Sequence, residues 1–283
     1  MPALAEPAPH PPASGARWSD LRKRLISAVI LAPLVLLCLW VGGLPYTILM
    51  LGAAIGLAWE WVSLCGAAPL GRLGAPVIGA VTAAALAAAL GHAEVGLILL
   101  VAGTIVTSLL VRGAPHKRAL ALGVPYVGVG VVALLWLRAD PQAGLVNLLF
   151  PLLLVWGSDI GAYLAGRVLG GPRLAPRISP GKTWSGAIGG LIGAVAMGWL
   201  VVSWSGQPAA FARVAAIAVG LGIFAQAGDL LESLIKRRFG VKDSGTLIPG
   251  HGGLLDRLDA LLIAAPVAAL LAFAAGRGVV LWQ

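Results

Sequence analysis

Apolar residues fill nine long runs of this chain, and the short segments between the runs hold most of its charges. Each run is close to the roughly 20 residues that an α-helix needs to cross the hydrocarbon core of a bilayer. The pattern therefore predicts an all-α polytopic integral membrane protein with about nine transmembrane helices, at residues 25–41, 44–64, 73–90, 95–111, 119–137, 145–169, 186–204, 210–235 and 258–275.

The composition supports a membrane protein and excludes an ordinary soluble domain. Of the 283 residues, 59% are hydrophobic and only 11% are charged, whereas soluble domains carry roughly 25% charged residues. The two cysteines, Cys38 and Cys65, lie in or beside apolar runs without the spacing of a metal site. We interpret them as small packing residues, a common role of free cysteines.

The distribution of Lys and Arg predicts how the helices are oriented, because cytoplasmic loops carry an excess of these residues. With the N-terminus in the cytoplasm, 17 of the 20 fall on inner segments, and only Arg138, Arg213 and Arg277 fall outside. We therefore expect a cytoplasmic N-terminus and an outside C-terminus. The net charge of +9 belongs to these loops, and it does not indicate nucleic acid as a partner, because no soluble face interleaves aromatic and basic residues.

The first 24 residues differ in character from the rest of the chain. Residues 1–16 contain five prolines, and residues 17–24 contain four basic residues just before the first apolar run. Such a Pro-rich segment is typical of a disordered tail, and it lacks the apolar core of a signal peptide. We expect residues 1–24 to form this tail with its basic flank, and residues 25–137 to form an N-terminal transmembrane bundle.

The segment 228–259 concentrates charge in an otherwise apolar sequence. It contains five of the 11 acidic residues and five of the 20 basic residues. Asp229, Ser233 and Lys236 are spaced so that a helix places them on one face, with Arg237 beside them. A carboxylate suits a divalent cation, and Lys and Arg suit phosphate oxygens. This face therefore predicts a site that holds a metal ion and a phosphate together.

The helical pattern of this segment stops at Gly240, and turn residues follow as far as Gly253. Glycines allow backbone N–H groups to approach an anion closely. Asp256 and Asp259 then lie three residues apart at the predicted start of the next helix, so they can share a face. We expect Asp229 and Asp256 to meet across the loop around one or two divalent cations. The alternative is a solvated loop whose charges pair with each other.

A second polar group lies at the end of the sixth run and in the loop that follows. Asp159 precedes Arg167 by about two helical turns, roughly 12 Å, and a carboxylate at that depth should face a polar cavity, a metal or a cation. Lys182 and Thr183 precede Gly186 at a predicted helix start, which favours an anion site. The alternative is that the basic residues of this loop only set the topology.

The segment 228–259 resembles the signature of the phosphatidate cytidylyltransferases, or CDP-diacylglycerol synthases. The family pattern is Ser-x-x-Lys-Arg, four residues, Lys-Asp, a short spacer with Gly and Ser, and then His-Gly-Gly-x-x-Asp-Arg-x-Asp. The match covers about a tenth of the chain, and the layout of the other apolar runs is also similar to the family's. Every fixed position is matched at the family's spacing, by Ser233, Lys236, Arg237, Lys242, Asp243, Ser244, Gly245, His251, Gly252, Gly253, Asp256, Arg257 and Asp259.

The region around Asp159 is also similar to the family, which has Asp-x-x-Ala-Tyr-x-x-Gly followed by Ser-Pro-x-Lys-Thr-x-x-Gly. Two positions depart from that pattern, since Gly181 replaces a usual Lys and Ser185 replaces a usual Glu. Any role of those two side chains in the family is therefore not carried over. The matching residues are Asp159, Ala162, Tyr163, Gly166, Ser179, Pro180, Lys182, Thr183 and Gly186.

The resemblance implies an enzyme that transfers CMP from CTP to phosphatidic acid at the cytoplasmic face of a bacterial inner membrane, giving CDP-diacylglycerol and pyrophosphate. It implies Mg²⁺ as cofactor, and it leaves open a second, monovalent cation such as K⁺ and a homodimer. Residues 138–283 then form the catalytic transmembrane region. The implied residues are Asp229, Asp256, Lys236, Arg237 and Ser233 for catalysis, Lys182, Thr183, Ser179, Lys242, Asp243, His251 and Arg257 for substrate phosphates, and Asp229, Asp256, Asp159 and Asp259 for the metal.

Several alternatives stay open at this point. A CTP-dependent polyprenol or phytol kinase is a second candidate, although it would lack the His-Gly-Gly-x-x-Asp-Arg-x-Asp run. A cation-coupled transporter is a third, although the charges here gather at one face. Asp159 either joins the metal or pairs with a cation such as Lys182, and His251 either binds phosphate or orders its loop. Glu60, between Trp59 and Trp61, is interpreted as an interfacial residue in preference to a site residue.

Overall fold

The computed structural model describes residues 29, 32–113, 117–248 and 252–283. The predicted disordered tail, residues 1–24, lies outside these ranges, as does His251. Within them, each of the nine apolar runs coincides with a helix.

The helices of the first half follow the predicted runs closely. A short helix, Ala32–Val41, ends at Gly42 (φ 70°), where glycine adopts a backbone conformation that other residues rarely take. The next four helices are α2 (Gly43–Leu64), α3 (Ala75–Ala89), α4 (Ala93–Leu110) and α5 (Ala119–Ala139).

The second half contains four longer helices and one small sheet. Two short antiparallel strands form a hairpin in the loop between the sixth and seventh runs, which is a departure from the all-α prediction. The elements are α6 (Gly144–Leu169), β1 (Arg173–Ala175), β2 (Ser179–Thr183), α7 (Trp184–Ser205), α8 (Phe211–Arg238) and α9 (Leu255–Ala275).

Seven of the described helices are long and apolar enough to cross a membrane, namely α2 and α4 to α9. The helices Ala32–Val41 and α3 are apolar but shorter. At about 1.5 Å per residue, the 15 residues of α3 span less than the roughly 30 Å of a hydrocarbon core. The described structure therefore supports an integral membrane protein, and the number of nine spans remains a prediction.

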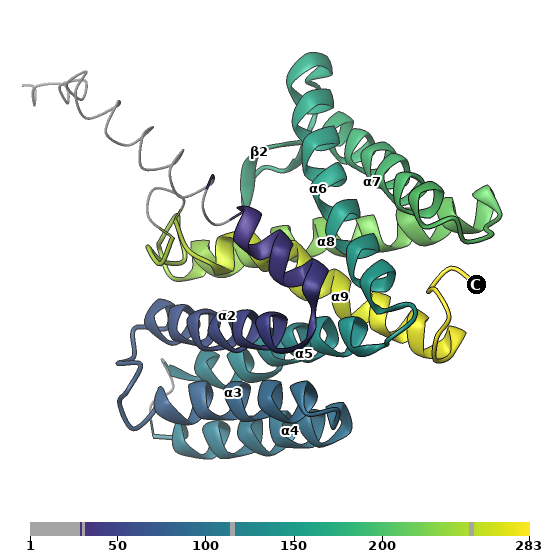
Figure 1. Cartoon of the computed structure of the whole chain (residues 1–283). Coiled ribbons are helices and arrows are strands. Elements are labelled where there is room, and N and C mark those ends of the chain that lie inside the picture. Colours follow the sequence, from purple (N-terminus) through teal and green to yellow (C-terminus); the bar gives the residue numbers. More distant parts are fainter. Residues whose placement is uncertain (1–28, 30–31, 114–116, 249–251) are drawn as a thin grey trace, which may run out of the picture.

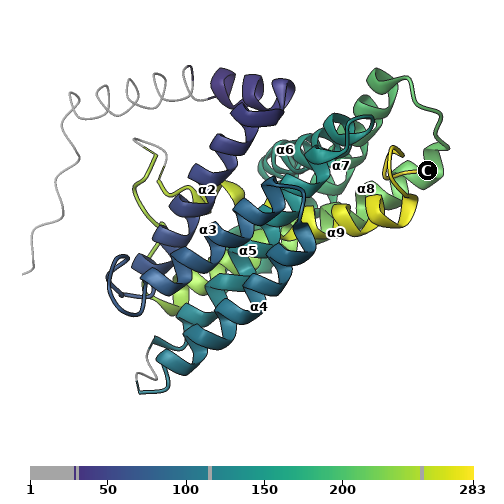
Figure 2. The same ribbon diagram turned by 60° about the horizontal axis from the view of Figure 1, so that its bottom comes forward.

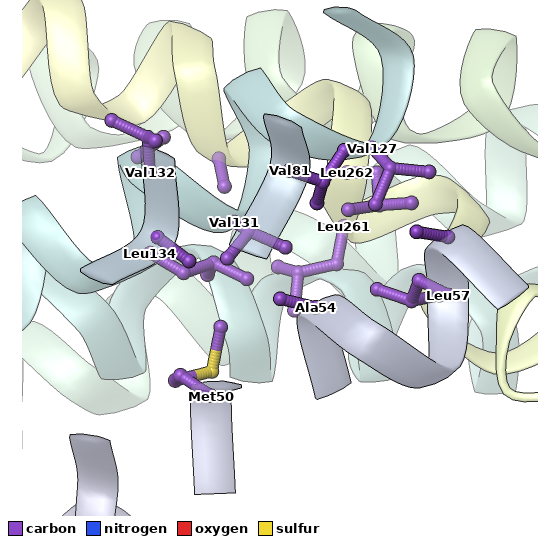
Figure 3. Close-up of a cluster of buried hydrophobic side chains, with 14 of the residues drawn as sticks. Met50, Ala54, Leu57, Val81, Val127, Val131, Val132, Leu134, Leu261 and Leu262 are labelled. Carbon is purple, nitrogen blue, oxygen red and sulfur yellow. The ribbon is translucent and has the colours of Figure 1, made fainter. Parts of the chain in front are cut away.

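The helices form two groups that share α9 (Figures 1 and 2). Helices α2, α3, α4 and α5 run side by side in one group, and α6 and α7 pair on the other side of α8 and α9. Figure 3 shows buried side chains of α2, α5 and α9 meeting in the core, among them Leu57, Val131 and Leu261. Two hydrogen bonds fix α2 on α5, from Tyr46 Oη to the Leu134 carbonyl (2.9 Å) and from Trp61 Nε1 to the Ala119 carbonyl (3.1 Å).

Helices α6 and α7 pack backbone against backbone through glycines. A Cβ atom on Gly161 would overlap the carbonyl oxygen of Gly189, and one on Gly193 would overlap the carbonyl oxygen of Gly157. We call this contact the glycine seam. Glycines four residues apart, such as Gly157 and Gly161, allow membrane helices to approach each other in this way.

The residues predicted to face outside gather at one end of the bundle. Arg138 donates to the carbonyls of Leu39 and Trp40, and the last residues fold back over this end. There, Asp140 accepts the N–H of Gly278 (2.7 Å), and Arg213 donates to the Gln283 carbonyl (2.6 Å). The hairpin and the segment 228–259 lie at the opposite ends of α6, α8 and α9. The hairpin follows the C-terminal end of α6, and the segment joins the C-terminal end of α8 to the start of α9.

Candidate functional site

A cavity of about 450 Å³ lies between α6, α7, α8 and the β-hairpin. We call it the α6–α8 cavity. Its polar lining comes from both groups that the sequence singled out: Asp159 from α6, Lys182 and Thr183 from β2, and Asp229 from α8. The structure thus joins residues that lie 70 positions apart, and the predicted polar cavity beside Asp159 is present.

An ion pair crosses this cavity. The Nζ atom of Lys182 lies 2.5 Å from Oδ2 of Asp229, and both side chains keep about a third of their surface exposed, at 26% and 36%. In the part of the chain that the structure describes, Lys182 forms its ion pair with Asp229, and no ion pair joins it to Asp159. Asp159 is exposed to the cavity, and the charge of Asp229 acts on it.

The hairpin and the start of α7 are ordered by side-chain hydrogen bonds. Thr183 is the N-cap of α7, where its hydroxyl accepts the N–H of Gly186 at 3.0 Å, a contact that satisfies a helix donor lacking an internal partner. Ser185, the residue that departs from the family pattern, contacts the Thr183 hydroxyl (3.0 Å) and donates to the Gly170 carbonyl. Ser185 thus helps to order the loop that presents Lys182.

Other predicted phosphate ligands lie beside the hairpin. Ser179 begins β2 and is half-buried, and Arg237 on α8 reaches the neighbouring Ile178 carbonyl at 3.4 Å. This contact brings the basic end of α8 against the hairpin.

A second set of charges lies between α8 and α9. Lys236 is 2.7 Å from Glu232 and 2.8 Å from Asp256, and its side chain is only 15% exposed. We call Glu232, Lys236 and Asp256 the α8–α9 charge cluster. Buried charges need such partners, because removing one from water without compensation is costly.

The loop between α8 and α9 is folded around Asp256. Its carboxylate accepts the N–H of Ser244 (3.0 and 3.1 Å) and the N–H of Gly253 (3.0 Å). The sequence predicted that backbone N–H groups of this loop would approach an anion. In the structure the anion is the protein's own carboxylate.

The structure gives Asp229 and Asp256 different partners. Asp229 faces Lys182 in the α6–α8 cavity, and Asp256 belongs to the α8–α9 charge cluster. Among the described residues, no group of three or more His, Cys, Asp or Glu side chains has the geometry of a metal site. Asp159 lines the same cavity as Asp229, and Asp259 lies on α9.

These three carboxylates suit a hard divalent cation in their chemistry. Oxygen ligands are the ones that Mg²⁺ prefers, and like charges held together in an apolar protein are stabilised by a cation between them. Asp259 is buried at 9% exposure and accepts the N–H of Ala260 at 2.8 Å. The chemistry of these carboxylates thus suits a divalent cation, although the described residues do not gather three of them in the geometry of a metal site.

The remaining predicted residues lie around the α8–α9 loop. Ser233 is half-buried on α8, whereas Lys242, Asp243 and Arg257 are exposed. Their roles toward a substrate stay predictions, and His251 lies outside the described residues.

The sequence interpretation missed the contribution of Glu60. Its side chain is 2% exposed, so it is not an interfacial residue, and it accepts the N–H groups of Leu254 (2.9 Å) and Leu255 (2.8 Å). The signal was present, since Glu60 is a lone carboxylate in an apolar run. The sequence could not reveal its partners, which lie 194 and 195 residues later.

Comparisons with known proteins show the family of this chain. A model of the cytidylyltransferase family matches residues 22–275, which include both groups of helices and all the polar residues described above. This chain belongs to the cytidylyltransferase family. It is therefore a nucleotidyltransferase, and the kinase and transporter alternatives are set aside.

Three relatives illustrate how far the similarity extends along the chain. A phosphatidate cytidylyltransferase of Brucella suis is 42% identical over 249 residues, covering 87% of this chain and 91% of the relative. One of Pseudomonas aeruginosa is 38% identical and covers 91% and 99% of the two chains, and one of Haemophilus influenzae is 34% identical and covers 87% and 96%. The similarity thus extends well beyond the segment 228–259, over most of the helices.

Proposed function

We propose that this protein is a CTP:phosphatidate cytidylyltransferase, which joins CMP from CTP to phosphatidic acid and releases pyrophosphate. The observation that carries the proposal is the α6–α8 cavity, where Lys182 and Asp229 meet in a membrane protein of the cytidylyltransferase family. The relatives of similar length bear the corresponding name.

The α6–α8 cavity supports the binding of a phosphate chain. Lys182 is a compact cation with three donors, suited to phosphate oxygens, and Arg237 adds a second cation beside the hairpin. In the reaction the lipid phosphate oxygen attacks the α-phosphorus of CTP, and the bond to pyrophosphate breaks. The protein then contributes positioning and charge neutralisation, with no covalent enzyme intermediate.

We infer that Mg²⁺ is the cofactor and that Asp229 holds it, with Asp159 and Asp259 as further candidate ligands. Such an ion neutralises phosphate charge and orients the substrate. The side chain of Lys182 would leave Asp229 to contact phosphate when the ion binds. Asp256 then supports Lys236 and the loop instead of ligating the ion, although a second, monovalent cation such as K⁺ in that neighbourhood remains part of the proposal.

The setting we propose is the inner membrane of a bacterium, with the cavity on the cytoplasmic side, where CTP is found. The bias of Lys and Arg supports this orientation, and Arg138, Arg213 and Arg277 would then face outside with Gln283. A homodimer is compatible with the proposal and is not required by it.

The function is tested with the purified full-length protein in mixed micelles of detergent and phosphatidic acid. We expect label from [α-³²P]CTP to enter lipid and label from [γ-³²P]CTP to leave as pyrophosphate, both only with Mg²⁺. Transfer of the γ-label to lipid would indicate a kinase, and no lipid labelling with any phosphatidic acid would contradict the proposal.

The orientation is tested by single cysteines at positions 179, 244 and 283 in a variant without Cys38 and Cys65. An impermeant maleimide added to intact cells should label position 283 alone, and labelling of position 244 with position 283 protected would reverse the orientation.

A further inference from the structure

The carboxylate of Glu60 is buried in a part of the protein that the proposed chemistry does not use. Glu60 lies on α2, in the N-terminal group of helices, and its side chain is 2% exposed. An ionisable group at such a position in a membrane protein is costly unless specific partners compensate it. Its partners are the N–H groups of Leu254 and Leu255, at 2.9 and 2.8 Å, at the start of α9.

We propose that Glu60 is a positioning residue, which fixes the start of α9 and thereby holds Asp256 and Lys236 in their working arrangement. The expected effect of Glu60 on catalysis rests on the proposed function. The contacts of Glu60 with the start of α9 do not depend on that function.

The first step of the argument is that Glu60 holds the residue next to Asp256. Leu255 is bound by Glu60, and Asp256 follows it directly in the first turn of α9. A carboxylate at a helix N-terminus is stabilised by the unpaired N–H groups and the helix dipole. The position of the Asp256 backbone is therefore set from α2.

The second step is that Asp256 transmits this position to α8 and to the loop. Its carboxylate bonds Lys236 at 2.8 Å and accepts the N–H groups of Ser244 and Gly253. Glu60 and Asp256 together thus accept four backbone N–H groups of the loop and the helix start, those of Ser244, Gly253, Leu254 and Leu255.

The third step is that the loop is shaped to admit the Glu60 side chain. A Cβ atom on Gly245 would lie 2.6 Å from Oε1 of Glu60, and one on Gly253 would lie 2.8 Å from Oε2. Real Cβ atoms essentially never approach another atom so closely. Glycine at position 245 is therefore required by the Glu60 side chain, whereas at position 253 a Cβ atom would meet the Ser244 hydroxyl before it met Glu60.

The fourth step is that α2 offers a fixed support. The neighbouring residue Trp61 donates to the Ala119 carbonyl, and Tyr46 donates to the Leu134 carbonyl, so α2 is held on α5 near both of its ends. The N-terminal bundle thus contributes more than membrane anchoring, because it carries one of the groups that place the site.

The test compares Glu60→Gln with Glu94→Gln in the full-length protein. Glu94 is a carboxylate in the first turn of α4 whose side chain is 71% exposed, so its variant controls for loss of a helix-borne charge. Glu60→Gln keeps the shape of the side chain but replaces one carboxylate oxygen with an NH₂ group, which cannot accept a backbone N–H. We expect faster hydrogen exchange at residues 252–258 and 241–248, unchanged exchange in α6 and α7, and a kcat per folded molecule lowered about tenfold or more.

A double-mutant cycle with Asp256→Asn separates positioning from general stabilisation. If Glu60 acts through Asp256, the double variant has about the kcat of Asp256→Asn alone, because the path is already broken. Independent, multiplicative losses of kcat would overturn the proposal, and so would Glu60→Gln with normal kcat and normal loop exchange.

Two further measurements decide the question if Glu60→Gln does not fold or the wild type is inactive. Should Glu60→Gln fail to fold, Gly245→Ala disturbs the same contact from the loop side and should reproduce the faster exchange. Gly245→Ala with loop exchange and kcat like the wild type would contradict the proposal. A wild-type protein without CTP-dependent lipid labelling would instead refute the proposed function, while the exchange data would still decide whether Glu60 orders the loop.

Discussion

The α6–α8 cavity and the α8–α9 charge cluster both contain a lysine paired with a carboxylate, but they differ in what surrounds the pair. In the cavity, Lys182 and Asp229 face open volume and hold only each other among the ion pairs of the described residues. In the cluster, Lys236 has two carboxylate partners, and Asp256 has two backbone N–H partners besides.

This difference indicates which charges are available to a ligand. The Asp256 carboxylate already accepts hydrogen bonds from Lys236, Ser244 and Gly253, so it mainly orders the protein. Asp229 has one ion-pair partner among the described residues, and it would have to give up only that partner to hold the proposed metal ion. Two aspartates of the same segment, 228–259, therefore have different roles, which their shared place in the sequence does not reveal.

The largest effect is expected from Asp229→Asn. If Asp229 faces the ligand, its loss should lower kcat/KM by at least about 100-fold, because charge neutralisation by a bound metal is worth several kcal/mol. The melting temperature should change little, since the carboxylate is 36% exposed. Labelled CTP incorporation across a Mg²⁺ titration and a thermal melt measure both quantities, and near-normal turnover at saturating Mg²⁺ would remove Asp229 from the site.

Asp256→Asn should lower the stability of the protein more than Asp229→Asn does. Removing one partner of a buried ion pair costs roughly 3–5 kcal/mol of stability, and here the loop N–H groups also lose an anionic acceptor. We expect a clearly lower melting temperature, together with reduced activity. If Asp256→Asn melted like the wild type and only lost activity, the distinction between the two aspartates would fail.

A smaller effect is expected in the contact between α6 and α7. Gly193→Ala places a methyl group against the Gly157 carbonyl in the glycine seam, and overpacking of this kind costs about 1–3 kcal/mol. Gly220→Ala is a matched control on α8, because a Cβ atom there meets nothing within 4 Å. Thermal melts should show a loss for the first and none for the second, and equal melting temperatures would argue against a rigid seam.

The smallest effect concerns Asp140, a carboxylate bound by backbone N–H groups far from both sites. Burial alone would raise its pKa, but the N–H groups of Ala143, Gly278 and Gln142 outweigh this and hold the pKa of Asp140 below its ordinary value of 3.8. A depressed pKa stabilises the protein above the ordinary value, and this contribution is lost as the pH falls through the lowered one.

The check is a series of melts of the wild type and Asp140→Asn between about pH 3 and pH 7. The two should differ at neutral pH and converge in acid. A difference that stays constant over the whole range would show that the carboxylate charge is not the cause.

Much of the fold was predictable because apolar runs and helices have the same lengths in a membrane protein. The runs at residues 44–64 and 119–137 nearly coincide with α2 and α5. The span expected at α3 stays a prediction, since this apolar helix has only 15 residues. The β-hairpin was missed because its strands have three and five residues, too few for a periodic pattern.

The site was predictable in its members but not in its pairings. The sequence placed Asp159, Lys182 and Asp229 among the functional residues, and the structure lines one cavity with them. It also grouped Asp229 with Asp256, because both flank one loop, whereas the structure gives them separate partners. Pairings of this kind depend on how helices cross, and that information lies in tertiary packing.

The glycine seam also restricts how the α6–α8 cavity can diversify. Gly161 and Gly193 are not among the residues that line the cavity, but they hold the backbones of α6 and α7 against each other, and no change of rotamer can relieve a backbone contact. Any larger residue in the seam would have to separate α6 from α7. New ligand preferences are therefore most accessible through α8, where Ala225 and Gln226 line the cavity with replaceable side chains.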